Sequence, residues 1–118
     1  MRGRADADNW ANDSVHVQFS DSVTEANAEA FRIGSTTSTR VNLEDCSGCG
    51  LSGWGWQDNG WGVGVLGPEI FFAASGSHTI RIQACEDGFS IDQIVLSPAR
   101  FISTAPGSLK NDNTILPR

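Results

Sequence analysis

The stretch SVHVQFS, residues 14–20, alternates between polar and apolar side chains along its whole length. Successive side chains of a strand point to opposite sides, so its three apolar residues would share one face and His16 and Gln18 the other. One apolar face with a period of two is typical of a strand that covers a core on one side and meets solvent on the other. The stretch predicts a half-buried strand with His16 facing solvent.

Similar short stretches recur between turn-forming residues, and no stretch has the period of an amphipathic helix. Residues 69–74 are apolar on both faces, which predicts a strand covered on both sides. Residues 78–84 and 89–96 are joined by the turn at 86–88, and this arrangement predicts a hairpin. Short strands of this kind indicate an all-β fold, an antiparallel β-sandwich. The predicted strands are residues 14–20, 31–33, 39–44, 69–74, 78–84 and 89–96.

The chain has 118 residues, which is enough for one domain with a single core. Residues 1–13 are polar and rich in Asp and Asn, so they predict a loop. Residues 104–118 are rich in Ser, Thr, Pro, Gly and Asn and predict a polar C-terminal tail or linker. We therefore expect a single β-sandwich module over residues 1–103.

The net charge of the chain limits the kinds of ligand that it is expected to bind. Fourteen acidic and eight basic residues give a formal net charge of −6, and the basic residues are scattered along the chain. Binding to nucleic acid or to an anionic membrane surface by bulk electrostatics is disfavoured. A neutral ligand is the better expectation.

Residues 46–67, which we call the tryptophan loop, hold eight of the thirteen glycines and three of the four tryptophans. Glycine weakens strands and helices, so this stretch predicts a shaped loop that presents aromatic rings. Indole faces stack on the C–H faces of sugar rings, and neighbouring amides and carboxylates bond sugar hydroxyls. The competing interpretation is that the tryptophans fold inward and cap the sandwich. The candidate ligand-binding residues are Trp10, Trp54, Trp56, Trp61, Gln57, Asp58 and Asn59.

The pair Cys46 and Cys49 is open to three interpretations: a local disulfide, a redox dithiol or half of a zinc site. A zinc site is disfavoured because the sequence offers no second close pair of ligands. A redox dithiol would open a helix, whereas glycine and tryptophan follow here. We favour a disulfide that clamps the tryptophan loop, which leaves Cys85 without a partner.

The segment from Gly76 to Leu96 contains GSHTIRI, then EDG, then SIDQIVL, and it resembles the closing strands of carbohydrate-binding modules of the family 6 and family 35 type. The segment SGWGW, residues 52–56, is similar to their tryptophan-bearing segment. The resemblance covers roughly residues 2–97. It implies a jelly-roll β-sandwich that accompanies secreted polysaccharide-degrading enzymes.

The chain departs from that family pattern at its start. The family's first strands supply acidic ligands for a structural calcium, and this chain begins after them. Asp92 matches the remaining calcium ligand, and Ser90 stands where the family carries an asparagine in its sugar cleft. The resemblance therefore implies a module that is incomplete at the N-terminus.

Together these features predict a non-catalytic module that binds a neutral poly- or oligosaccharide by tryptophan stacking, within a larger secreted protein. The chain itself shows no secretory signal peptide. The alternative is a structural or adhesion module that forms a homodimer through a sheet edge left open by the absent strands. A hydrolase is disfavoured because the candidate carboxylates lie in turns without a recognisable nucleophile and base. Those carboxylates are Asp45, Asp58, Glu86 and Asp87.

Overall fold

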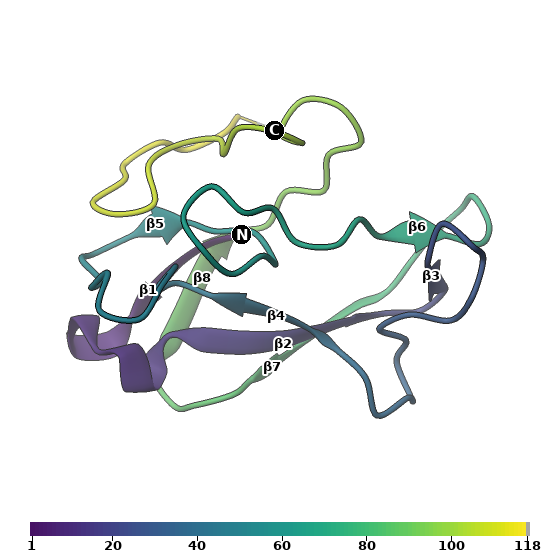
Figure 1. Cartoon of the computed structure of the whole chain (residues 1–118), viewed down its shortest axis with the longest axis horizontal. Coiled ribbons are helices and arrows are strands. Elements are labelled where there is room, and N and C mark those ends of the chain that lie inside the picture. The colour runs from purple at the N-terminus through teal and green to yellow at the C-terminus, as the bar shows by residue number, and fades with distance from the viewer. Residues whose placement is uncertain (118) are drawn as a thin grey trace.

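The structure, a computed structural model, describes residues 1–117, and its strands pair antiparallel (Figure 1). No helix longer than a single 3-10 turn occurs in this part of the chain, which confirms the predicted all-β class. The strands are β1 (Arg2–Ala5), β2 (Ser14–Phe19), β3 (Ser22–Val23), β4 (Thr39–Asn42), β5 (Gly55–Trp56), β6 (Phe71–Phe72), β7 (Ile80–Ala84) and β8 (Phe89–Gln93), and the 3-10 turns are η1 (Asp6–Asp8) and η2 (Trp10–Asn12).

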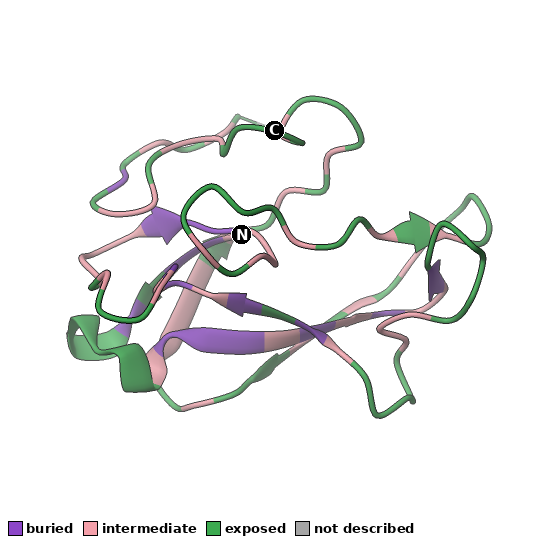
Figure 2. Cartoon of the chain, in the orientation of Figure 1, coloured by how far each residue is buried: buried purple, intermediate pink, exposed green. Residues whose placement is uncertain are grey.

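Two three-stranded sheets share one core. Their strand orders are β5-β1-β8 and β4-β2-β7, and β3 and β6 form a small separate pair. Buried Val15, Val17 and Phe19 of β2 pack with Val41 of β4, and partly buried side chains from β6, β7 and β8 surround them. The strand predicted at residues 14–20 is confirmed, with its apolar face inward. This arrangement fits a β-sandwich, and Figure 2 shows buried residues in β1 to β5, whereas β6, β7 and β8 are intermediate or exposed.

The predicted hairpin over residues 78–96 is wrong. β7 pairs with β2, whereas β8 pairs with β1, so the turn between them carries the chain from one sheet to the other. Backbone hydrogen bonds hold that turn to both layers: Cys85 N donates to Ser14 O (3.2 Å) and Asp6 N to Gly88 O (2.8 Å). Two alternating stretches joined by a short turn look the same in either case, because alternation reports one buried face and does not identify the pairing partner.

The loop predicted for residues 1–13 begins with the central strand of a sheet. Arg2 is 5% exposed, and a side chain at Gly3 would lie 2.8 Å from Phe89 Cζ. The sequence does not indicate this strand, because it contains a buried arginine and a glycine and neither residue favours strands.

Two further predicted strands are shorter than expected or absent. Residues 31–33 make only an isolated bridge, from Arg32 to Phe19, because Phe31 has a φ of 51°, outside the extended region. Only Phe71 and Phe72 of residues 69–74 form a strand, and Phe71 is 37% exposed. The expectation of cover on both faces is therefore wrong for this strand.

The segment predicted as a tail lies along β5 (Figure 1). Trp56 N donates to Ser108 O (3.0 Å) and Asp112 N donates to Trp54 O (2.8 Å). Further along, the amide of Gln93 exchanges two hydrogen bonds with the backbone of Leu116. The edge of β5 is thus covered by residues from the end of the chain.

Candidate ligand-binding cavity

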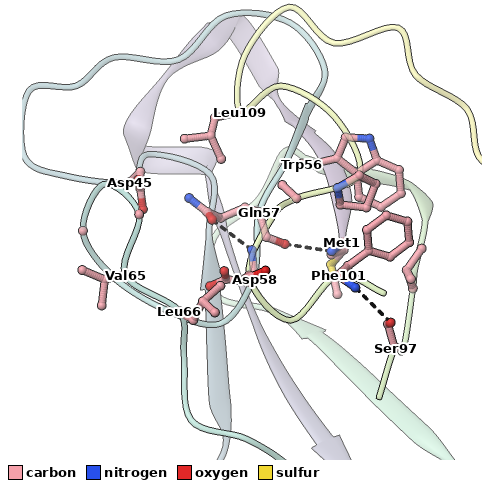
Figure 3. A pocket seen from close by; sticks show the side chains of 16 residues that line it. Met1, Asp45, Trp56, Gln57, Asp58, Val65, Leu66, Ser97, Phe101 and Leu109 are labelled. Carbon is pink, nitrogen blue, oxygen red and sulfur yellow. Dashed lines mark hydrogen bonds between the residues drawn. The ribbon is translucent and has the colours of Figure 1, made fainter. Parts of the chain in front are cut away.

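A cavity of about 340 Å³ lies between the tryptophan loop and the segment that follows β8. Figure 3 shows Trp56 and Phe101 on one side of it, and Asp45, Val65 and Leu66 on the other. Cavities of this size, mostly apolar with a few polar groups, are the usual form of small-molecule sites. The wall is completed by Met1, Gln57, Asp58, Gly62, Gly64, Val95, Ser97, Ser103, Ala105, Pro106 and Leu109.

The end of β5 positions the polar part of the wall. Met1 and Gln57 exchange two backbone hydrogen bonds of 2.8 Å, which extend the pairing of β1 with β5 by one residue. On the opposite edge of β5, the backbone N–H of Trp56 donates to Ser108 O. Gln57 and Asp58 are therefore fixed at the point where the strand ends and the loop begins.

A tight turn forms the opposite side. Gly62 N donates to the backbone oxygen of Asp45 (2.8 Å), and Val65 N donates to Gly62 O (2.9 Å). A side chain at Gly60 would overlap the carbonyl oxygen of Val65, so only glycine allows the loop to close this tightly. The glycine content of the tryptophan loop thus shapes the cavity wall.

The cavity contains polar groups that the protein leaves without partners. Gln57 is 7% exposed; its Oε1 accepts from Asp58 N (2.9 Å), but its Nε2 donates to none of residues 1–117. Asp45 is 5% exposed, and no described residue donates to its carboxylate. The second carboxylate, of Asp58, accepts from Gly60 N (2.5 Å) through one oxygen. The lining residues therefore carry two buried donors without described partners, Gln57 Nε2 and Trp56 Nε1, and two carboxylates.

Three predicted ligand-binding residues converge here, and their roles differ from those expected. Trp56 is 1% exposed, so it presents no face at the surface and serves as wall and core. Gln57 and Asp58 supply polar groups. Asn59 lies at the next residue, but its amide is used internally, because Nδ2 donates to Thr39 Oγ1 (3.1 Å) and Pro68 O (3.0 Å).

The other predicted residues lie outside the cavity. The guanidinium groups of Arg2 and Arg4 lie 4.9 and 5.6 Å from the centre of the Trp54 ring. Ser90 on β8 lies opposite Arg4 on β1, so its side chain is on the face of the sheet where Arg4 contacts Trp54. Trp10 in η2 is 70% exposed. These residues do not form one site with Gln57 and Asp58.

Trp61 is 52% exposed and does not line the cavity, although the next residue, Gly62, does. Its ring is therefore available at the surface beside the turn that closes the cavity.

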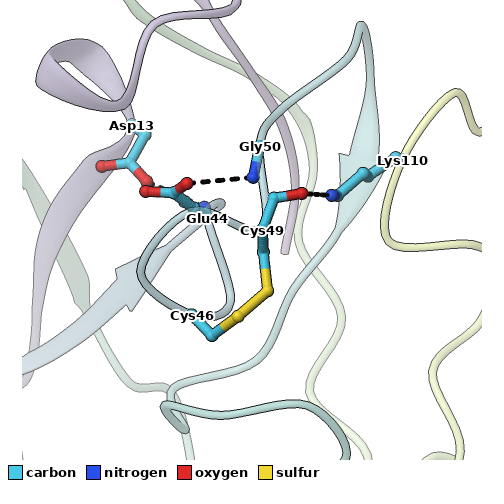
Figure 4. The surroundings of a disulfide bond; sticks show 6 residues. All are labelled: Asp13, Glu44, Cys46, Cys49, Gly50 and Lys110. Carbon is cyan, nitrogen blue, oxygen red and sulfur yellow. Dashed lines mark hydrogen bonds between the residues drawn. A yellow bond between two sulfur atoms is a disulfide. The ribbon is translucent and has the colours of Figure 1, made fainter.

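The predicted disulfide is supported, since Cys46 and Cys49 are bonded with a Cα–Cα distance of 5.3 Å (Figure 4). Cys85 is exposed and unpaired. Lys110 Nζ donates to the backbone oxygen of Cys49, and Gly50 N donates to Glu44 Oε1 (3.0 Å). The hydrogen bond from Lys110 thus links the disulfide-bonded segment to the C-terminal part of the chain.

The calcium implied at Asp92 does not fit the residues present. Asp92 forms an ion pair with the guanidinium of Arg2, and a cation next to this guanidinium would be repelled. No group of three potential metal-ligating side chains occurs within residues 1–117. That same part of the chain contains no helix long and apolar enough to cross a membrane.

Sequence reasoning missed Phe101, Val65 and Leu66 as cavity residues and considered Asp45 only as a hydrolase carboxylate. Asp45 carries one recognisable signal, because it directly precedes the clamped Cys46. No local pattern marks Phe101, whose position depends on the path of the chain after β8.

Comparisons with protein-family models, with curated proteins and with solved structures find no match to this chain.

Proposed function

We propose that the chain is a non-catalytic module that binds a neutral poly- or oligosaccharide, with one sugar unit in the cavity between the tryptophan loop and the segment after β8. The observation that carries this proposal is the buried Nε2 of Gln57, which has no partner among the described residues, beside the carboxylate of Asp45. A buried donor left unpaired costs about 1–3 kcal/mol, so a ligand acceptor there is favoured.

The chemistry of the wall supports a polyhydroxylated ligand. Sugar hydroxyls both donate and accept, so they can bond the Gln57 amide and the carboxylates of Asp45 and Asp58 together. The side chains of Phe101, Val65 and Leu66 supply apolar contact for C–H faces. An anionic ligand is disfavoured, because both charged side chains that line the cavity are acidic.

The wall lacks the groups that acyl-transfer catalysis requires, although its two carboxylates are of the kind that glycoside hydrolysis uses. No histidine, lysine or cysteine lines the cavity. Ser97 is used structurally, since its Oγ accepts from the backbone N–H groups of Arg100 (2.8 Å) and Phe101 (3.2 Å). A nucleophile with a placed base, which hydrolysis by acyl-type chemistry requires, is therefore missing from this wall.

A glycan array tests the proposal with three proteins. The wild-type chain should retain one class of neutral oligosaccharide. Gln57→Leu should lose about 1–2 kcal/mol of binding free energy, since it removes the amide at nearly constant volume. Asn113→Leu, which removes an amide at an exposed position outside the cavity, is the control and should bind as the wild type does. Equal retention by all three, with each variant folded, would remove the assignment.

We also infer that the parent protein is secreted. The disulfide between Cys46 and Cys49 supports this location, because disulfides persist in oxidising compartments.

A second candidate is a self-associating structural module, favoured by one open side of the sandwich. β7 and β8 are edge strands of their sheets, and Ile94, Leu96 and Ile102 nearby in the chain are 44%, 59% and 54% exposed. Unpaired edges and exposed aliphatic side chains favour pairing with a second copy. Light scattering over a range of concentrations would detect the homodimer, and a constant monomer mass would exclude it.

A further inference from the structure

A second cavity, of about 350 Å³, lies on the outer face of the β4-β2-β7 sheet and shares no lining residue with the saccharide cavity. Side chains of His16 and Gln18 on β2 and of Arg81 and Gln83 on β7 form its floor, and the loop of residues 35–38 supplies its wall. His16 pairs with Gln83, and Gln18 with Arg81, so all four project from the same face. We call this cavity the outer cleft.

Strand β2 holds the wall in place. Gln18 Nε2 donates to the backbone oxygens of Ser35 (3.1 Å) and Thr37 (2.8 Å), which uses both amide hydrogens. His16 Nδ1 is bonded to Ser38 Oγ (2.8 Å). The loop is therefore tied to the strand and does not depend on a ligand for its position.

The outer cleft differs from the rest of the molecule in charge. The chain carries a net charge of −6, yet no carboxylate lines this cleft. Arg81 lies within it, and Arg40 pairs with His16 across β4 and β2 on the same face. Glu86 lies beside the first residue of β2, where its carboxylate accepts from Ser14 Oγ (2.8 Å) and partly offsets the charge of Arg40.

Hydrogen-bond donors remain available in the cleft. Arg81 gives one N–H to Gln83 Oε1 (3.2 Å), which leaves the other guanidinium donors free of described partners. The Nε2 of Gln83 likewise donates to no residue of the described chain. A guanidinium and a neighbouring amide can both donate hydrogen bonds to an oxyanion, and no carboxylate in the cleft would repel it.

We propose that the outer cleft binds an oxyanion group, a carboxylate, sulfate or phosphate, with Arg81 as its charged anchor and Gln83 as a second donor. The group can come from a free anion or from an acidic substituent on a larger ligand. This site is independent of the neutral saccharide site, and either can exist without the other.

Titration of ¹⁵N-labelled protein with sodium sulfate, phosphate or acetate tests the proposal, with sodium chloride at matched ionic strength as the reference. The amide signals of β2, β7 and residues 35–38 should shift and saturate with the oxyanions. Arg81→Gln should weaken binding by about tenfold, the effect of losing one charge-assisted contact. Arg100→Gln, at an exposed arginine outside the cleft, should leave binding unchanged.

Equal shifts with chloride, or undiminished saturation in a folded Arg81→Gln variant, would overturn the site. If Arg81→Gln loses the dispersed spectrum of the folded chain, Gln83→Leu replaces it and should reduce affinity in the same direction. A parallel titration with a sulfated oligosaccharide distinguishes a free anion from an acidic substituent. Tighter binding of the oligosaccharide than of inorganic sulfate indicates a substituent, and equal affinity indicates a free anion.

Discussion

The buried arginine of β1 links three parts of the chain. Arg2 forms an ion pair with Asp92 of β8, and its Nη2 donates to the backbone oxygen of Asp112 (2.7 Å). The Asp112 carboxylate, itself 4% exposed, lies 3.9 Å from Arg2 Nε. A charged residue at the centre of a sheet is costly unless it is paired, so these contacts fix the end of the chain against β1.

Asp112 predicts how stability depends on pH. Burial acts to raise the pKa of its carboxyl, but hydrogen bonds from Thr114 and Ser108, together with the charge on Arg2, outweigh burial and lower the pKa below the ordinary 3.8. A lowered folded-state pKa contributes stability above 3.8 that is lost as the pH falls through the folded value. Asp112→Asn should therefore flatten the decline of stability below about pH 4, measured by urea unfolding at several pH values. An unchanged slope relative to wild type would contradict this role.

At the scale of single elements, the sequence could identify strands that have one clean apolar face. β2 and β4 were predicted with nearly the observed bounds, because their alternating residues decide which side is buried. β1 could not be predicted, since its burial depends on Arg2 meeting carboxylates that lie far away in the chain. β7 pairs with β2 and β8 pairs with β1, and the local alternation of residues does not identify these distant partners.

The C-terminal segment is an element that the sequence marks as a tail and the structure places against β5. A side chain at Gly55 would overlap the carbonyl oxygen of Leu109, so the two backbones approach as closely as glycine permits. Gly55→Ala should force the strand and segment apart and destabilise the fold by about 1–3 kcal/mol, measured by chemical unfolding. Asn113→Ala, at an exposed position in the same segment, is the control and should change stability little. Wild-type stability for Gly55→Ala would show that the segment does not rest on β5.

For the candidate site, part of the tryptophan loop lines the cavity, but the indoles of Trp54 and Trp61 do not. Glycine and tryptophan content indicated a shaped aromatic loop, and Gln57 and Asp58 do line the cavity. The sequence could not show that Trp56 is buried, because a tryptophan in a loop has no period from which its direction follows. Phe101 reaches the site only through the packing of the whole chain.

At the scale of the whole molecule, the all-β fold carries two separate cavities with polar lining residues. One is the acidic, partly aromatic cavity between loops, and the other is the cleft with Arg81 on an outer sheet face. Their opposite charge predicts different ligands, so a competition experiment between a neutral oligosaccharide and sulfate should show no mutual exclusion.

The most direct test of the central claim is an NMR titration with the neutral oligosaccharide that the array retains best. The account predicts saturable shifts of the Gln57 side-chain amide and of the Trp56 indole N–H, because both belong to residues that line the cavity. Shifts confined to the indole signals of Trp10, Trp54 or Trp61, with Gln57 unmoved, would contradict it and place any sugar on the outside of the molecule.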